Sequence, residues 1–192
     1  MIKAISFDLY NTLVQFWPPL DEVQQAACRE LGLNVCKASI RRGYAVADIF
    51  FNEENGRNSL GLRSAEERLD FFARYEQLIL ENAGLPVSLD LARQVWAMAM
   101  TIPKDFVAFD DTIPALEALR AQGYRLGVLS NLRRDMDELC ENLGLATFLD
   151  FCISPTEPGG EKPDPAMFLE ALNRVSVAAE EAVHVGDQYG SD

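Results

Sequence analysis

The sequence predicts an α/β protein, with a doubly wound parallel-sheet core and an all-helical insert after the first strand. Two observations indicate this fold. After residue 100, short apolar strands alternate with amphipathic helices, which is typical of a parallel sheet with right-handed crossovers. Residues 15–100 show helical periodicity and no strand signal. We therefore expect a Rossmann-like core of residues 1–14 and 101–192 and a helical insert of residues 15–100.

Four helices are expected in the insert. Apolar residues at helical spacing predict the first helix over 20–31 and the second over about 40–51. The turn-forming run Asn55-Gly56-Arg57-Asn58 is expected to break the second helix. A Ser64-x-x-Glu67 capping box predicts the start of the third. Ser88 is expected to cap the fourth.

The core elements are predicted by short apolar runs and by helix-ending residues. Glycine marks the end of two helices, because it adopts the left-handed conformation that often follows a helix. In chain order we expect a strand at 2–7, a helix from Pro114 to Gly123, a strand at 124–129, a helix from Met136 to Gly144, a strand at 151–153, a helix opened by Asp164-Pro165 and a strand at 182–185.

Composition excludes several classes of function. The 192 residues include 30 Asp and Glu against 17 Lys and Arg, and the net charge of −13 disfavours nucleic acids and anionic membranes as partners. No run reaches the roughly 18 apolar residues of a membrane-spanning helix, and no signal peptide is recognisable. The four cysteines form no CxxC pair, so we expect free thiols and a cytoplasmic location.

Polar side chains follow each core strand at its carboxyl end, where parallel α/β sheets bind their ligands. Asp8 and Thr12 follow the first strand, Ser130 and Asn131 the second, and Lys162 a loop expected over 157–161 after the third. The residues that follow the fourth strand include two aspartates, Asp187 and Asp192. A carboxylate here suits nucleophilic attack, and the other carboxylates suit Mg²⁺, which prefers oxygen ligands and also contacts substrate phosphates. Lysine and small hydroxyls would hold the oxygens of a transferred phosphoryl group.

In this order and spacing, the polar runs resemble the four motifs of the haloacid dehalogenase-like (HAD) hydrolase superfamily. The matching runs are Phe7-Asp8-Leu9-Tyr10-Asn11-Thr12-Leu13, Leu129-Ser130-Asn131, Lys162-Pro163-Asp164-Pro165 and the stretch from Gly186-Asp187 to Asp192. Each run is weak evidence alone, but the ordered set spans nearly the whole chain. The insert is then similar to the helical cap of this superfamily, which would exclude water and select the substrate.

The resemblance implies a role for each matching residue. Asp8 would be the nucleophile, and Thr12 would orient its loop. Ser130, with Asn131, would bind the transferred group, and Lys162 would steady the nucleophile and the intermediate. The implied ligands of Mg²⁺ are Asp8, the backbone carbonyl of Tyr10, Asp187 and Asp192.

Tyr10 departs from the pattern of the phosphatases in this superfamily, which place a second Asp two residues after the nucleophile to protonate the leaving oxygen. Tyrosine, with a pKa near 10, is a poor acid at neutral pH. Haloacid dehalogenases carry Tyr there, because a halide leaves without a proton, and they bind the substrate carboxylate through a cap arginine, for which Arg41 and Arg42 are candidates. Asp187 instead favours a metal-dependent phosphatase, because a further carboxylate beside Asp8 needs a compensating cation.

Three functions stay open at this point. The first is a Mg²⁺-dependent phosphatase that acts on a small phosphorylated metabolite through an aspartyl-phosphate at Asp8. The second is a 2-haloacid dehalogenase that forms an ester on Asp8, and the third is a degenerate member that binds a ligand without turnover. We expect a small anionic substrate and a monomer or homodimer. Because the superfamily usually continues with one more strand and helix after the fourth motif, we also expect a chain cut short at its C-terminus.

Overall fold

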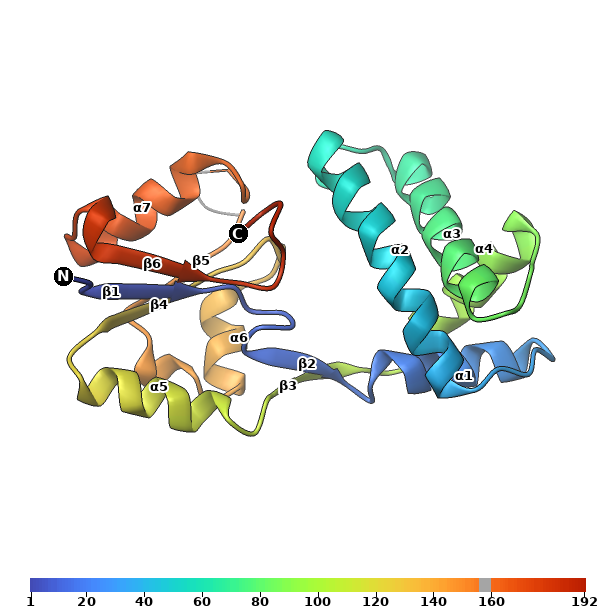
Figure 1. Ribbon diagram of the computed structural model, residues 1–192, viewed down its shortest axis with the longest axis horizontal. Coiled ribbons are helices and arrows are strands. Elements are labelled where there is room, and N and C mark those ends of the chain that lie inside the picture. The colour runs from blue at the N-terminus through green and yellow to red at the C-terminus, as the bar shows by residue number, and fades with distance from the viewer. Residues whose placement is uncertain (156–159) are drawn as a thin grey trace. The chain divides into compact units, whose positions relative to one another are not determined.

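The computed structural model describes residues 1–155 and 160–192, which form two compact units (Figure 1). The core unit consists of residues 1–15 and 106–192, and the helical unit of residues 16–105. The loop expected over 157–161 therefore lies partly outside the described residues. Of the helices that the structure describes, none is both long enough and apolar enough to cross a membrane.

A four-stranded parallel sheet forms the centre of the core unit. Its strands, in the order β5-β4-β1-β6, are Phe151–Ile153, Arg125–Leu129, Ala4–Phe7 and Ala182–Val185. The helix α7 (Pro165–Val175) covers one face, and α5 (Thr112–Ala121) and α6 (Met136–Asn142) lie on the other (Figure 1). This arrangement confirms the doubly wound α/β core.

The register of the sheet aligns the carboxyl ends of its strands. Phe7 of β1 lies opposite Val128 of β4 and Val185 of β6. The ladder continues one step further, because the amide of Asp8 donates a hydrogen bond of 2.8 Å to the carbonyl oxygen of Val185. The amide of Ser130 likewise donates to the carbonyl oxygen of Ile153 at 3.0 Å. Asp8 and Ser130 are thus held at the same edge of the sheet.

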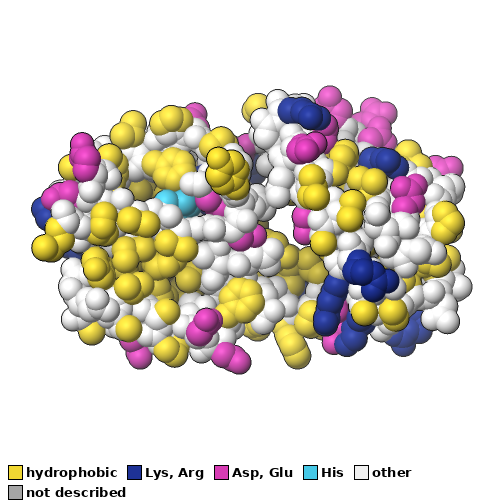
Figure 2. All heavy atoms as spheres, in the orientation of Figure 1, with side chains coloured by type: hydrophobic (Ala, Val, Ile, Leu, Met, Phe, Trp, Pro, Cys, Tyr) yellow, Lys and Arg dark blue, Asp and Glu magenta, His cyan; other side chains and the backbone are white. Residues whose placement is uncertain are grey.

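Close packing around β4 holds this edge in place. Leu126, Val128 and Leu129 are fully buried, and burying each such side chain contributes about 1.5–3 kcal/mol. Gly127 is required by the ring of Phe151, since a Cβ atom at residue 127 would lie 2.1 Å from a ring carbon. The edge strand β6 is more exposed to solvent than β4, with the side chains of Val183 and Val185 about 40% exposed. Hydrophobic side chains also gather on the surface of the core unit (Figure 2).

The helical unit contains the four expected helices, α1 (Leu20–Glu30), α2 (Lys37–Arg57), α3 (Ala65–Asn82) and α4 (Leu89–Thr101). The capping box at the start of α3 is confirmed: the Ser64 hydroxyl accepts from the Glu67 amide, and the Glu67 carboxylate accepts from the Ser64 amide. Ser88 caps α4 by accepting from the amide of Leu91. Buried apolar side chains from all four helices pack into one core.

Two sequence-based expectations were wrong. The run Asn55–Asn58 does not break the second helix, because α2 continues to Arg57, whose side chain forms an ion pair of 2.7 Å with Glu54. Residues 15–100 are not free of strand, because β2 (Val14–Trp17) pairs with β3 (Asp105–Ala108) in a separate two-stranded sheet. These two strands pair with each other across a long stretch of the sequence, and no local pattern shows such a pairing.

Candidate active site

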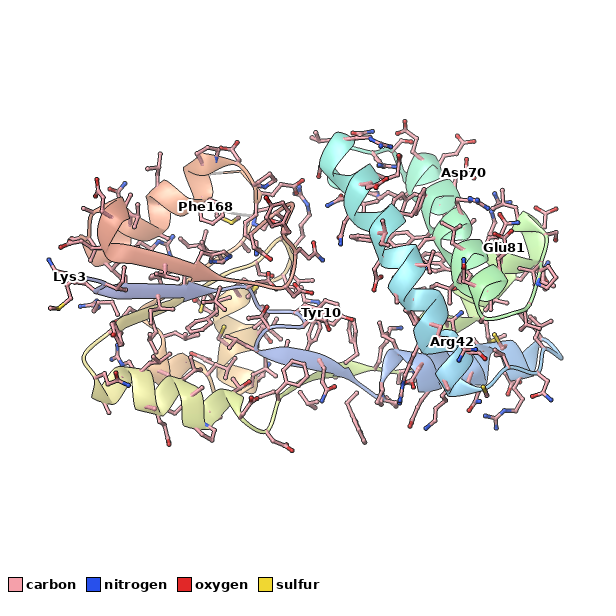
Figure 3. All side chains as sticks on the ribbon, in the orientation of Figure 1. Lys3, Tyr10, Arg42, Asp70, Glu81 and Phe168 are labelled. Carbon is pink, nitrogen blue, oxygen red and sulfur yellow. The ribbon has the colours of Figure 1, made fainter. Side chains whose placement is uncertain are left out.

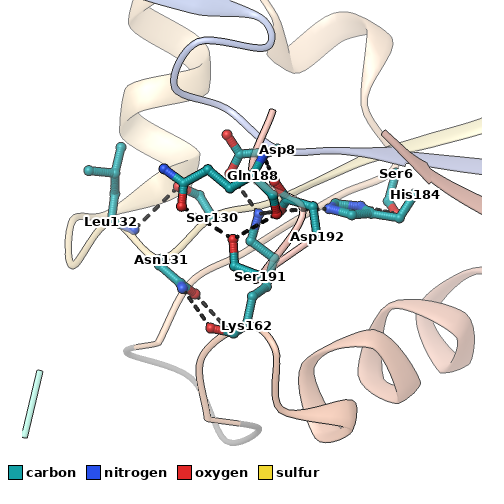
Figure 4. Close-up of polar contacts among 10 residues, drawn as sticks. All are labelled: Ser6, Asp8, Ser130, Asn131, Leu132, Lys162, His184, Gln188, Ser191 and Asp192. Carbon is teal, nitrogen blue, oxygen red and sulfur yellow. Dashed lines mark hydrogen bonds and ion pairs between the residues drawn. The ribbon is translucent and has the colours of Figure 1, made fainter. Parts of the chain in front are cut away.

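A buried lysine joins two carboxylates at the carboxyl edge of the sheet (Figure 4). The ammonium nitrogen of Lys162 lies 2.6 Å from Oδ1 of Asp8 and 2.5 Å from Oδ1 of Asp192. Lys162 is only 4% exposed, and the two carboxylates are also largely buried. Charge-assisted hydrogen bonds of this length are the strong ones, so Lys162 fixes the position of Asp8.

The pKa values of the two carboxyl groups that contact Lys162 are shifted in opposite directions. Burial raises the pKa of Asp8, and the nearby charge of Lys162 opposes this effect without cancelling it. Burial also acts to raise the pKa of Asp192, but hydrogen bonds from His184, Lys162 and the Gln188 amide outweigh it and hold that pKa well below its ordinary value. Asp192 is therefore a stable anion, and Asp8 is the more basic of the pair.

Ser130 and Asn131 follow β4 directly and face the same region (Figure 4). The Asn131 side chain forms two hydrogen bonds with the backbone of Lys162: its amide nitrogen donates to the carbonyl oxygen at 2.8 Å, and its oxygen accepts from the N–H at 2.7 Å. The hydroxyl of Ser130 is buried and accepts from the amide of Leu132 at 3.3 Å. The proton of that hydroxyl stays available for a ligand oxygen.

The loop after β1 turns tightly beyond Asp8. The carbonyl oxygen of Leu9 accepts from the amides of Leu13 and Val14 at 2.9 and 3.0 Å, and Asn11 adopts the left-handed conformation with φ of 63°. The hydroxyl oxygen of Thr12 is buried, and among the described residues it is the only such side-chain atom without a hydrogen-bond partner. The role of Thr12 in orienting this loop stays a prediction.

Asp187 lies close enough to Asp8 for their charges to interact. Burial raises the pKa of Asp187, and the charge of Asp8 raises it further, whereas a hydrogen bond from the Asn11 side chain lowers it. Two neighbouring carboxylates with raised pKa values repel each other, and a bound cation would relieve this repulsion. The donor chemistry at Asp8 and Asp187 therefore fits a hard cation such as Mg²⁺.

The metal site is not preformed as a cluster. In the part of the chain that the structure describes, no three or more His, Cys, Asp or Glu side chains are grouped as a metal would need. Both oxygens of Asp192 already accept hydrogen bonds from protein donors, Oδ1 from Lys162 and Oδ2 from the Gln188 amide. The predicted role of Asp192 as a ligand thus competes with its contact to Lys162.

The remaining predicted site residues make other contacts. The ring of Tyr10, in the loop after β1 (Figure 3), packs against Phe106 with 6.0 Å between centroids. Arg41 forms an ion pair of 2.7 Å with Asp21, and Arg42, labelled on α2 in Figure 3, bonds to residues of its own helix. All contacts given for the two arginines lie within the helical unit, and their role in substrate binding stays a prediction.

The sequence analysis assigned no role in the site to two polar residues inside strands. His184 of β6 lies directly opposite Ser6 of β1, and its ring contacts both Ser6 and Asp192 (Figure 4). The sequence does show that Ser6 and His184 are polar residues within two otherwise apolar strands, which could have marked them as candidates. Their pairing was not predictable, because 178 residues separate them in the sequence.

Comparison with known proteins shows a consistent set of relatives. The family profile of haloacid dehalogenase-like hydrolases matches residues 2–192. The human "Haloacid dehalogenase-like hydrolase domain-containing protein 3" is 30% identical over the whole chain and 76% of its own length. The glyceraldehyde 3-phosphate phosphatase of Methanopyrus kandleri is 32% identical, and the ribulose-1,5-bisphosphate 5-phosphatase of Halopiger xanaduensis 29%; each match covers this whole chain and 78% or 79% of the relative.

Solved structures agree on the fold. A HAD phosphatase from Thermococcus onnurineus superposes with a TM-score of 0.53 at 24% identity, over 100% of this chain and 80% of that one. An L-2-haloacid dehalogenase superposes with a TM-score of 0.58 at 20% identity, over 96% and 78%. Because one neighbour is called a phosphatase and the other a dehalogenase, the shared fold does not distinguish the two chemistries.

Proposed function

Because the chain belongs to the haloacid dehalogenase-like hydrolase family, we propose that it is a Mg²⁺-dependent phosphatase that hydrolyses a small phosphorylated metabolite through an aspartyl-phosphate at Asp8. The observation that carries the proposal is that Asp187 and Asp8 are near enough for their charges to interact, since such a pair of carboxylates suits a cation that also binds phosphate. Two relatives named as phosphatases of sugar phosphates support it. In the same proposal, the core of residues 1–14 and 101–192 carries out catalysis, and the cap of residues 15–100 selects the substrate.

The first step forms a bond between a carboxylate oxygen of Asp8 and the phosphorus atom. The bond between phosphorus and the leaving oxygen breaks, and the leaving group departs with the electron pair. Lys162 holds Asp8 in place through its contact of 2.6 Å and offsets negative charge on the phosphoryl oxygens. The buried Ser130 hydroxyl donates to one of these oxygens.

The second step returns the enzyme to its starting state. Water attacks the phosphorus atom, the bond from phosphorus to Asp8 breaks, and inorganic phosphate leaves while the proton of the water passes to solvent. Asp8, Asp187 and the backbone carbonyl of Tyr10 would hold Mg²⁺. The bound cation would offset the charge of the phosphate group in both steps.

A dehalogenase is the second candidate, and Tyr10 is the observation that favours it. The side chain at this position is not a carboxylic acid, and a halide needs no proton from it. In that reaction Asp8 would attack carbon and release the halide, and water would then hydrolyse the ester. A cytoplasmic location and a monomeric or homodimeric state stay predictions under either function.

One assay distinguishes these functions. We would incubate the protein and its Asp8→Asn variant with glyceraldehyde 3-phosphate, p-nitrophenyl phosphate, acetyl phosphate, chloroacetate and 2-chloropropionate, each with Mg²⁺ or with EDTA. The proposal predicts phosphate release that requires Mg²⁺ and Asp8. Halide release that persists in EDTA would instead establish the dehalogenase. No release from any substrate, with ligand binding unaffected by Asp8→Asn, would indicate a binding protein.

A further inference from the structure

His184 connects the interior of the sheet to the lysine at the site. Its Nδ1 atom lies 2.8 Å from the hydroxyl oxygen of Ser6, and its Nε2 atom lies 3.3 Å from Oδ1 of Asp192 (Figure 4). The same Asp192 oxygen contacts the ammonium group of Lys162 at 2.5 Å. A continuous series of polar contacts thus runs from β1, through β6, to the group that holds Asp8.

The acceptors in this series determine which ring nitrogen carries a proton. An ionised carboxylate is an acceptor only, so Nε2 of His184 must carry the hydrogen that bonds to Asp192. In the neutral ring Nδ1 is then the acceptor, and the Ser6 hydroxyl donates to it. The ring of Phe168 on α7 packs edge-on against the imidazole at 5.3 Å between centroids. Ser6 and Phe168 therefore hold the ring in one orientation.

Apart from the Lys162 ammonium, which it is proposed to hold, and the His184 ring, Asp192 has its described contacts within its own loop. Oδ2 accepts from the Gln188 amide at 2.9 Å, and the Asp192 amide donates to the Gln188 carbonyl at 2.9 Å. These bonds shape the loop but do not tie it to the sheet. His184 is the residue that connects the Asp192 carboxylate to a strand of the core.

We propose that His184 is a positioning residue, which holds the Asp192 carboxylate so that Lys162 stays beside Asp8. The proposal rests on the proposed function for its effect on catalysis, but not for the contacts themselves. Through Asp192, the orientation of the imidazole sets the position of the Lys162 ammonium. A residue that orients another group in this way typically changes activity by about 10–100-fold when it is removed.

Nuclear magnetic resonance tests the contacts without any substrate. The chain has one histidine and four lysines, and Lys162 is the only lysine buried among the described residues, so both signals are readily assigned. In ¹⁵N-labelled protein we expect His184 protonated at Nε2 and slow exchange of the Lys162 ammonium protons. His184→Phe should speed that exchange about tenfold or more, and His184→Gln, which keeps an N–H donor, should restore it. A ring protonated only at Nδ1, or unchanged Lys162 exchange in His184→Phe, would overturn the proposal.

Kinetics test the consequence for catalysis. We expect His184→Phe to lower kcat about tenfold or more, with KM within about threefold, and His184→Gln to recover most of the loss. Val183→Thr, on the opposite side of the same strand, is the control for general damage to β6 and should behave like the wild type. An undiminished kcat in a folded His184→Phe variant would refute the positioning role. Absence of turnover in the wild type would contradict the proposed function, and the magnetic resonance result would still decide the role of His184.

Discussion

The side chain of Asn131 binds the backbone of Lys162 through both of its polar atoms. The two hydrogen bonds, of 2.8 and 2.7 Å, match a primary amide to the C=O and N–H of a single residue. The Lys162 ammonium group is held from the other end by Asp8 and Asp192. The lysine is therefore fixed at its backbone and at its tip, which suits a cation that must not move during phosphoryl transfer.

Replacing Asn131 by Ala should weaken catalysis more than substrate binding. Loss of both hydrogen bonds frees the backbone of Lys162, and we expect kcat to fall about tenfold while KM changes little. Asn131→Asp keeps the acceptor for the Lys162 N–H but loses the donor. Its kcat should lie between those of Asn131→Ala and the wild type. Steady-state kinetics with p-nitrophenyl phosphate measures the effect. A raised KM at unchanged kcat would instead support the substrate-binding role that the sequence suggested.

Tyr10 should limit the enzyme to substrates with good leaving groups. With no carboxylic acid at this position, an alkoxide must leave without a proton, whereas p-nitrophenolate and acetate leave as stable anions. We expect Tyr10→Asp to raise kcat/KM for glyceraldehyde 3-phosphate about tenfold or more. The same substitution should change kcat/KM for acetyl phosphate far less. Tyr10→Asn is the control for the change in side-chain volume. Equal changes for both substrates would argue against a role in protonation.

A buried carboxyl group makes the helical unit sensitive to pH. Glu76 on α3 is 1% exposed, and its oxygen accepts from the amide nitrogen of Gln24, whose own oxygen accepts from the Tyr44 hydroxyl at 3.3 Å. Burial raises the pKa of Glu76 to about 8, although the hydrogen bond from Gln24 opposes this. The folded unit therefore keeps Glu76 protonated at pH values where the unfolded chain has ionised it.

Stability of the helical unit should fall as pH rises from about 5 to about 8. Over this range the folded state binds one more proton than the unfolded state at Glu76, so the free energy of unfolding decreases by up to about 1.4 kcal/mol per pH unit. Glu76→Gln should remove this contribution. Urea unfolding followed by tryptophan fluorescence measures it, because Trp17 and Trp96 both belong to the helical unit. The exposed Glu66→Gln, on the same helix, should keep the wild-type dependence, and a similar slope in Glu76→Gln would contradict the assignment.

Local signals in the sequence were sufficient for most of the fold. Apolar runs located β1, β4, β5 and β6, and capping side chains located the starts of α3 and α4, because both depend on residues close together in the chain. The short strands β2 and β3 were missed, because each is stabilised by pairing with a distant segment. The end of α2 was misplaced, because contacts such as the Arg57–Glu54 ion pair support a helix through glycine.

The site shows the same division between local and distant information. The motif positions placed Asp8, Ser130 and Lys162 at one edge of the sheet. The bond between Asp8 and Lys162 connects residues 154 positions apart, and its geometry follows from strand register. The amide of Asn131 was assigned to the substrate, and only three-dimensional packing directs it to the backbone of Lys162. Side-chain partners of this kind are not encoded in any single motif.

Two glycines of α2 should respond in opposite ways to the same substitution. A Cβ atom at Gly43 would lie 2.2 Å from the carbonyl oxygen of Ile79, so α2 and α3 must separate to admit it. We expect Gly43→Ala to lower the free energy of unfolding of the helical unit by about 1–3 kcal/mol. At Gly56 no atom lies within 4 Å of the added Cβ, and Gly56→Ala should stabilise by up to about 1 kcal/mol, because alanine favours the helix.

Tryptophan fluorescence during urea unfolding compares the two variants within the helical unit. The substitution is chemically identical and the helix is the same, so the difference isolates the contact between Gly43 and Ile79. Both variants should keep the wild-type dependence on urea concentration, and only the midpoint should move, down for Gly43→Ala and up for Gly56→Ala. Equal midpoints would mean that α2 and α3 approach each other less closely than the structure places them.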